Sequence, residues 1–177
     1  NNECLLSKVL IFTEILDRDL QNIYNVKYNF FEYGQTAISA TLRHSKGHKG
    51  HAFQFFQKNG PLALLPMINK RGNNYSSLVW TEKTDNISSL ISSKKDLEDS
   101  LNNLCSDYLG KISISKGPSS FVLKKLSGVN ALSNGALFVG DALRAMHPMA
   151  GQAWNQSLRD IAYIADAFAE SEKLGLD

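Results

Sequence analysis

The stretch that most constrains the fold of this chain is residues 136–160, where a short strand, a sharp loop and a helix follow one another. Residues 136–139 are apolar and follow the turn-forming sequence Ser-Asn-Gly, a pattern typical of a short buried strand. Gly140 and Asp141 end this strand. After Gln152, apolar residues recur every three or four positions as far as Phe168, which predicts a helix with one apolar face.

The loop between this strand and this helix has the residue types of a ligand site. His147-Pro148 interrupts any helix, because proline has no N–H and favours an extended residue before it. The free N–H groups and the dipole of the following helix favour negative charge at its start. Gly151 would let a flat ligand approach the backbone closely, and Asp141 could accept hydrogen bonds from ligand hydroxyls. An ordinary strand-to-helix turn, with Asp141 as a local cap, is the alternative, and the residue types leave both open.

Composition restricts the class of protein. A chain of 177 residues with 43% hydrophobic and 20% charged residues is globular, and suits one domain or a large part of a two-domain enzyme. The net charge of +2 is too small to indicate a nucleic-acid-binding protein. There is no apolar run of about eighteen residues and no signal-peptide pattern, so we expect a cytoplasmic protein. The absence of an initial Met suggests a segment of something longer, and Cys105 is expected in a helix core.

The middle of the chain has the alternation of β-strands. Three consecutive strands joined by turns predict an antiparallel meander, followed by a helix over 93–109 that Ser93 would cap. Two further short strands are expected on either side of a turn at Gly117-Pro118. His44, His48 and the residues between them read as a solvated hairpin loop, because no carboxylate or cysteine accompanies them, and no metal site is predicted. The predicted strands cover residues 31–42, 51–56, 60–67, 76–81, 112–115 and 121–126.

Several residues of the first stretch carry a family resemblance. Gly140-Asp141-Ala142, His147 to Gln152, Asn155 and Leu158-Arg159-Asp160 resemble the second flavin motif of aromatic-ring flavin hydroxylases. The most similar branch is the FAD-dependent hydroxylases of ubiquinone biosynthesis, relatives of para-hydroxybenzoate hydroxylase. The resemblance implies that the aspartate binds the ribityl chain of FAD and that the loop and the asparagine lie against the isoalloxazine ring. The cofactor-binding residues predicted in this way are Gly140, Asp141, Pro148, Gly151, Gln152 and Asn155.

Some positions depart from that motif, and others extend the resemblance. Arg144 stands where the family has a histidine, and Ala153 where it has a glycine. The segments 33–38, 60–67 and 76–81 are similar to strands of the family's substrate domain. The second of these implies a wall of the substrate pocket made by Leu62, Leu64 and Pro66; an ordinary edge strand, where proline is tolerated, is the alternative.

The resemblance implies an α/β fold with α+β character. Residues 1–28 would be a remnant of a Rossmann-like FAD/NAD(P)-binding domain, and residues 127–177 its strand, Gly-Asp loop and helix. Residues 29–126 would be an antiparallel-sheet substrate domain of the para-hydroxybenzoate-hydroxylase type. The Gly-x-Gly-x-x-Gly loop that cradles the FAD pyrophosphate in this family does not occur in the sequence.

Two functional hypotheses follow. In the first, the chain is a segment of an FAD-dependent monooxygenase that hydroxylates a polyprenylated phenol with NAD(P)H and O₂. Its partners would be that hydrophobic phenol, the missing N-terminal part of the enzyme, and a biosynthetic complex or the surface of the inner membrane. In the second, the chain is a non-catalytic relative that acts as a scaffold. No residue is assigned as catalytic: His147 is a general base by type only, a structural role is the alternative, and the chain alone is expected to be inactive.

Overall fold

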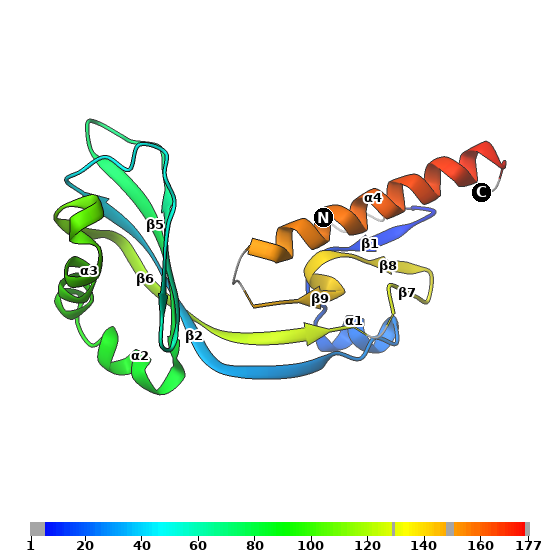
Figure 1. Ribbon diagram of the computed structural model, residues 1–177. Helices are drawn as coiled ribbons and strands as arrows, with labels where there is room; N and C mark the ends of the chain where they lie inside the picture. Colours follow the sequence, from blue (N-terminus) through cyan, green and yellow to red (C-terminus); the bar gives the residue numbers. More distant parts are fainter. Residues whose placement is uncertain (1–5, 129, 148–150, 176–177) are drawn as a thin grey trace. The chain divides into compact units, whose positions relative to one another are not determined.

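The computed structural model describes residues 6–128, 130–147 and 151–175. It contains two compact units, which we name the central unit (residues 32–123) and the terminal unit (residues 1–31 and 124–177). The central unit is an antiparallel sheet with two helices, and the terminal unit is a small sheet with a parallel strand pair and two helices (Figure 1). This mixture confirms the predicted fold class.

An antiparallel sheet forms the frame of the central unit. β4 pairs with β3 on one side, Ala63 opposite Gln54, and with β5 on the other, Ala63 opposite Val79. β5 also pairs with β2 over ten residues, from Gln35–Lys83 to His44–Asn74, so the predicted meander is confirmed. The strands are β2 (Asn29–His44), β3 (Phe53–Gln57), β4 (Gly60–Pro66), β5 (Asn74–Lys83) and β6 (Ile112–Ser127).

β6 corrects one prediction. Two short strands were expected with a turn at Gly117-Pro118, whereas the structure has one continuous strand, Ile112–Ser127, next to β2. Gly117 has φ +94°, and a Cβ at this position would lie 3.1 Å from the carbonyl oxygen of Ser39. The glycine therefore allows β6 to stay close to β2 where a larger residue would push it away.

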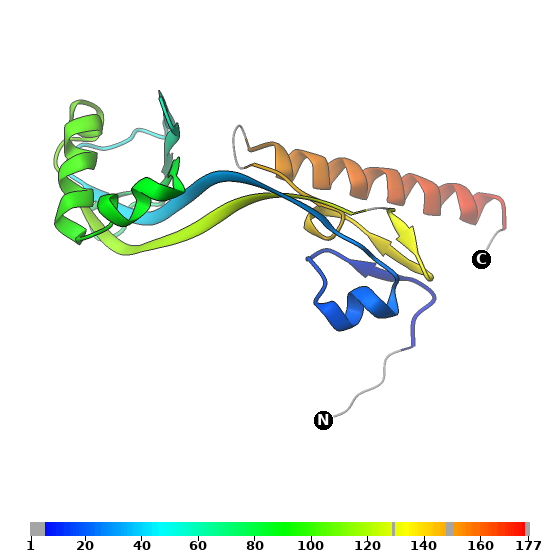
Figure 2. The ribbon, with the colours of Figure 1, turned by 90° about the horizontal axis from the view of Figure 1, so that it is seen from below.

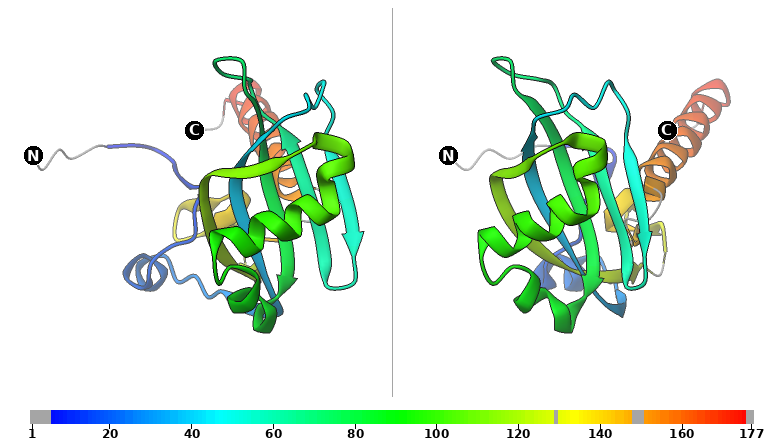
Figure 3. Two further views of the ribbon diagram at one scale, coloured as in Figure 1. Left: turned by 90° about the vertical axis from the view of Figure 1, so that its left-hand side faces the viewer. Right: turned by 60° about the vertical axis from the view of Figure 1, so that its left-hand side comes forward.

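The core of the central unit lies between one face of the sheet and two helices, α2 (Thr84–Leu90) and α3 (Lys94–Leu109) (Figure 3). The predicted helix and its cap are confirmed, because the Ser93 side chain accepts a hydrogen bond from the N–H of Asp96 at 3.1 Å. Each fully buried leucine stabilises the fold by about 1.5–3 kcal/mol. The sheet contributes Ile38, Leu42, Leu62, Leu64 and Leu78 to this core, and α3 contributes Leu97, Leu101, Cys105 and Leu109.

The terminal unit is built on three short strands. β1 (Leu10–Phe12) runs parallel to β8 (Ala136–Phe138), and β7 (Leu132–Ser133) pairs with β8 on its other side. A short 3₁₀ helix, η1 (Gly140–Ala142), follows β8, and β9 (Arg144–Ala145) pairs with the end of β6. Figure 2 shows α1 (Arg18–Ile23) and α4 (Gln152–Lys173) on opposite sides of the small sheet.

The two sides of this small sheet are packed differently. On the α1 side, the ring of Phe12 lies 5.0 Å from that of Tyr24 and 5.5 Å from that of Phe138, and Tyr28 Oη donates to the carbonyl of Ala142 at 2.9 Å. On the other side, no residue of α4 is buried, and Trp154 is 70% exposed. The predicted helix is therefore present, but the described residues do not cover its apolar face.

None of the helices in the described part of the chain combines the length and the apolar character that a membrane span requires.

Candidate functional site

The candidate site lies at the carboxyl ends of β1 and β8 in the terminal unit. The parallel pairing places Phe12 opposite Phe138, and the N–H of Val139 donates to the carbonyl of Phe12 at 3.0 Å. Glu14 follows the end of β1 by two residues and Asp141 follows the end of β8 by three. In open α/β sheets, ligands bind outside the carboxyl ends of parallel strands, so both carboxylates stand where a ligand is expected.

Asp141 is held at this edge by its neighbours. Its side chain is exposed, whereas Gly140 and Ala142 on either side are buried. The N–H of Ala142 donates to the carbonyl of Thr13 at 3.3 Å, which ties η1 to the end of β1. Gly140 has φ +57°, and a Cβ there would lie 3.0 Å from Ser157 Oγ on α4. Gly140 thus lets η1 pack closely against α4, which leaves Asp141 facing outward.

An ion pair joins this turn to α4. The Arg144 guanidinium donates to the carboxylate of Asp160, which also accepts the N–H of Gly140 at 3.3 Å. The Asp160 side chain is 12% exposed and that of Arg144 is 33% exposed. In the sequence, Arg144 stands out only as a departure from the motif, and its pairing with Asp160 was not predicted. The available signal was a basic residue on the segment before a helix that has an aspartate in its early turns, outside its apolar stripe.

The start of α4 exposes polar groups. Gly151 is the N-cap residue, with φ +60° and no side-chain cap, and no described atom lies within 4 Å of a Cβ built there. Gln152 and Asn155 are both exposed in the turns that follow. The first N–H groups of α4 and two side-chain amides are therefore open to a ligand. Pro148, which was also predicted to bind the cofactor, lies outside the described residues.

These groups fit the flavin that the sequence resemblance implies. An exposed carboxylate suits the hydroxyls of a ribityl chain, and the helix start suits a planar ring with polar, partly anionic edges. The open space at Gly151 would admit such a ring close to the backbone. Of the six predicted cofactor residues, Asp141, Gly151, Gln152 and Asn155 are accessible, and Gly140 is buried with a packing role.

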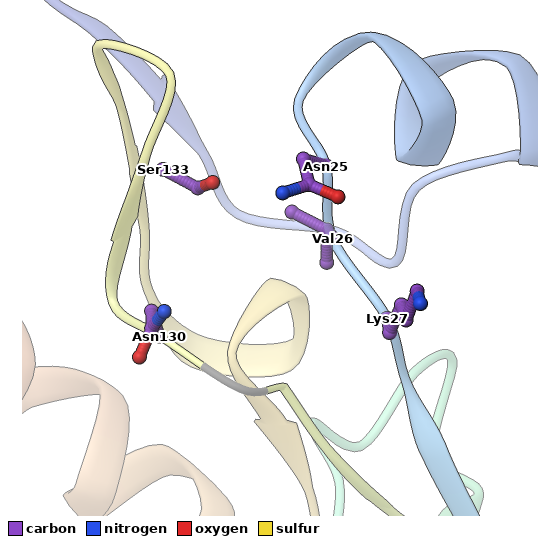
Figure 4. A pocket seen from close by; sticks show the side chains of 5 residues that line it. All are labelled: Asn25, Val26, Lys27, Asn130 and Ser133. Carbon is purple, nitrogen blue, oxygen red and sulfur yellow. The ribbon is translucent and has the colours of Figure 1, made fainter.

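Two hollows on the terminal unit are lined by described residues. One, of about 380 Å³, is lined by residues 11–17 and Leu20, so it begins where β1 ends and includes Glu14. The other, of about 240 Å³, is lined by Asn25, Val26, Lys27, Asn130 and Ser133 and contains none of the predicted site residues (Figure 4). The first hollow therefore adjoins the candidate site, whereas the second is lined by other residues of the unit.

The predicted substrate wall needs a correction. Leu62 and Leu64 are fully buried in the core beneath α3, so their side chains are not available to a substrate. Successive residues of a strand point to opposite faces, and the prediction placed these two on the wrong face. Ala63 and Leu65 point to the other face of β4, and Pro66, the third predicted residue, is exposed.

The four histidines differ in burial: one is buried, two are half-buried and one is exposed. His44 was expected in a solvated loop, but it is 3% exposed: its Nδ1 donates to the Lys46 carbonyl at 2.7 Å and its Nε2 accepts from Ser76 Oγ at 3.0 Å. Burial lowers the pKa of His147, which keeps its imidazole neutral at pH 7. Among the described residues, no group of three His, Cys, Asp or Glu side chains has metal-site geometry.

Comparison with known proteins gives a consistent set of relatives. The family described as "FAD binding domain" matches residues 25–173. Ubiquinone hydroxylase UbiL of Rhodospirillum rubrum is 37% identical over 82% of this chain and 33% of its own length. The 3-demethoxyubiquinol 3-hydroxylase of Escherichia coli is 22% identical over 98% of this chain and 43% of its own length. The chain therefore spans between a third and a half of these relatives.

Solved structures show the same fold. The crystal structure of p-nitrophenol 4-monooxygenase PnpA from Pseudomonas putida aligns with a TM-score of 0.70 and 12% identity, over 96% of this chain and 42% of that one. PqsL from Pseudomonas aeruginosa, in complex with 2-aminobenzoylacetate, aligns with a TM-score of 0.71 and 14% identity, over 94% and 46%. At these identities the likeness concerns the fold alone.

Proposed function

Because the chain belongs to the FAD binding domain family, as its flavin motif predicted, we propose that it is part of an FAD-dependent monooxygenase that hydroxylates a polyprenylated phenol in ubiquinone biosynthesis. The observation that carries this proposal is the exposed Asp141, on a turn that packs against α4, together with the start of α4, which has no side-chain cap. The relative named ubiquinone hydroxylase, 37% identical to this chain, supports the pathway. NAD(P)H and O₂ are the co-substrates that this reaction needs.

Each accessible site residue has a distinct task in this proposal. Bound FAD would supply the transfer of electrons from NAD(P)H and the activation of O₂. Asp141 would accept hydrogen bonds from the ribityl hydroxyls, and Gln152 and Asn155 would contact the polar edge of the ring. The first N–H groups of α4 would favour negative charge on that edge. The Arg144–Asp160 pair would hold η1 against α4, so that Asp141 and the helix start keep a fixed spacing.

The substrate would lie on the open face of the central sheet. Ala63 and Leu65 point to this face, and Pro66 stands at the end of the same strand. Pockets for hydrophobic ligands are mostly apolar with few polar anchors, which suits a phenol with a polyprenyl tail. No side chain is proposed as an acid or a base for the reaction.

The proposal also names partners and a location. The dinucleotide loop of the family would be supplied by an N-terminal part of the same enzyme, in keeping with relatives that are about two to three times as long as this chain. A substrate with a polyprenyl tail resides in lipid, so the enzyme would work at the cytoplasmic surface of the inner membrane. Association with other biosynthetic enzymes at that surface belongs to the same proposal.

A second function, that of a non-catalytic partner in the pathway, rests on one observation. Arg144 replaces a histidine of the flavin motif and is used here in an ion pair with Asp160. A scaffold would keep such a structural contact without keeping the flavin.

FAD retention distinguishes the two functions. Flavin absorbance would be measured after desalting, on this chain and on the longest natural product that contains it. We expect the longer product to retain FAD and its Asp141→Ala variant to lose at least about tenfold in affinity, because hydrogen bonds to a charged group contribute about 1.5–3 kcal/mol. Asp166→Ala, on a later turn of α4, is the matched control. If the longer product retains no flavin, the enzyme proposal fails and the scaffold takes its place.

A further inference from the structure

We propose that one end of the central sheet is a docking surface for a membrane that contains anionic phospholipids. We call this surface the basic tip. The inference deepens the membrane location proposed above and rests on it, but it uses none of the flavin-site residues. The basic tip consists of Arg43, Lys46, Lys49, Lys70, Arg71 and Lys111, together with Met67 and Ile68.

The sheet brings three separate segments to this end. β2 and β5 pair with His44 opposite Asn74, and β4 and β5 pair with Pro66 opposite Ser76. The loop after β2 and the loop between β4 and β5 therefore leave the sheet at the same end, at the upper left of Figure 1. The start of β6 joins them, because the N–H of Ser45 donates to the carbonyl of Lys111 at 3.1 Å.

Charge is concentrated in these segments. Residues 43–51, 66–75 and 109–115 contain six of the 19 Lys and Arg residues and none of the 17 Asp and Glu residues. All six cationic side chains are exposed, and within the described part of the chain none forms an ion pair. Lys46 Nζ donates instead to the backbone carbonyl of Asp107 at 2.8 Å. Since the whole chain has a net charge of only +2, the positive potential is local to this end.

Hydrogen bonds hold the loops of the basic tip in place. His48 Nε2 donates to the carbonyl of Met67 at 3.0 Å, which links the loop after β2 to the loop after β4. Within the second loop, the N–H of Lys70 donates to the carbonyl of Asn73 at 3.2 Å, and Asn69 Nδ2 donates to Asn74 Oδ1 at 3.1 Å. The cationic side chains are therefore presented together by ordered loops.

Two further features select lipid as the partner. Ile68 is 84% exposed and Met67 is 40% exposed, on the same loop as Lys70 and Arg71. A basic cluster beside exposed aliphatic side chains suits an interface where headgroups are anionic and the layer below is apolar. Nucleic acid bases would instead stack on aromatic side chains.

A hollow in the same surface suits the headgroup itself. It measures about 470 Å³ and is lined by Arg43, His44, Ser45, Asn73, Lys111 and Ser113. The guanidinium of Arg43 and the ammonium of Lys111 are donors of the kind that bind phosphate oxygens. An anionic phospholipid offers a phosphodiester for this hollow and acyl chains for Ile68 at the same time.

Vesicle co-sedimentation of the full 177-residue chain tests this surface. We expect binding to vesicles of phosphatidylcholine and phosphatidylglycerol in equal parts, weakening with added salt, and little binding to phosphatidylcholine alone. Lys70→Glu/Arg71→Glu should lower the partition coefficient by about thirty-fold or more, since each basic residue near an anionic surface contributes about fivefold. Ile68→Ser should lower it severalfold.

Matched controls distinguish binding through the basic tip from an effect of net charge or of exposed apolar side chains elsewhere. Lys94→Glu/Lys95→Glu changes the net charge equally but lies at the start of α3, and Phe56→Ser removes an 80% exposed side chain at the other end of β3. Both should bind vesicles as the unmodified chain does. Equal loss in the two charge variants, equal binding to neutral vesicles, or displacement from vesicles by a single-stranded oligonucleotide would each overturn the proposal. Flavin retention, measured separately on the longer product, would survive such a failure, so the two proposals can fail independently.

Discussion

The central and terminal units differ in how completely each one buries the apolar face of its long helix. Both contain a long amphipathic helix. In the central unit, α3 buries Leu97, Leu101, Cys105 and Leu109 against the sheet. In the terminal unit, α4 is 22 residues long and buries none, with Ile161 54% exposed.

The difference shows what a periodic apolar face requires. Most of the stability of a helix comes from packing its apolar face, so a helix without a partner contributes little to the core. Residues 32–123 supply the partner of α3 within a single unit. For α4 the described residues supply a contact with η1 and the ion pair of Arg144 with Asp160, and these leave every residue of the helix at least partly exposed. The flavin motif thus lies in the less complete of the two units.

The largest expected effect is a contrast between leucines on the two helices. Leu101→Ala should lower the free energy of unfolding by about 2–5 kcal/mol, because it leaves a cavity in a fully packed core. Leu158→Ala on α4 removes a side chain that is 46% exposed and should cost less than about 1 kcal/mol. Urea denaturation followed by circular dichroism measures both, and equal costs would contradict the contrast.

Breaking the Arg144–Asp160 pair should lower the stability of the terminal unit and leave that of the central unit unchanged. Asp160→Asn should cost about 1–3 kcal/mol, because it leaves a partly buried guanidinium and the N–H of Gly140 with a weaker acceptor. Each unit contains one tryptophan, so Trp80→Phe leaves Trp154 as the fluorescent reporter of this unit. A double-mutant cycle with Arg144→Met should show coupling, and additive effects would mean that the pair contributes nothing.

A smaller effect is expected at the start of α3. Ser93→Ala should cost about 1 kcal/mol, because it removes the N-cap hydrogen bond to Asp96. Hydrogen bonds from Ser93 and Ser92 lower the pKa of Asp96, so their contribution is present above its usual pKa and is lost as pH falls through the lowered value. The variant should move the pKa of Asp96 back up in an NMR titration. Ser88→Ala, on α2, should change neither quantity.

The smallest effect concerns a single thiol. Burial raises the pKa of Cys105 from 9.0 to about 11, so the folded thiol stays protonated and unreactive at pH 8. Because the unfolded thiol ionises first, this group favours unfolding as pH rises from 9.0 towards about 11. In a Cys4→Ser variant, a thiol reagent should modify Cys105 only after urea is added. Rapid modification of the folded chain would show that the core of the central unit opens readily.

The sequence predicted best what depends on neighbouring residues. The bounds of α3 follow from a cap at Ser93 and a four-residue apolar repeat, and the meander follows from alternation and turns. The motif around Asp141 is also local, and it identified the family. Features that depend on distant residues were not predicted: β6 continues through Gly117 because Ser39 lies close by, and Arg144 meets Asp160 across a loop.

The two leucines of β4 show a third kind of limit. A strand pattern indicates that alternate residues share a face, but it does not say which face meets the helix. Leu62 and Leu64 face α3, so they belong to the core and not to the predicted substrate wall. The exposure of α4 was unpredictable for a related reason, since a periodic face gives no information about whether its partner is present.

Native-state hydrogen exchange of the 177-residue chain would decide whether the two units differ as described. Amides of β5 and α3 should exchange slowly, near the limit set by global unfolding, because they enclose the buried core. Amides of α4 from Gln152 to Lys173 should exchange much faster, since none of its residues is buried. If α4 were as protected as α3, the terminal unit would be complete in itself, and the contrast between the two units would be wrong.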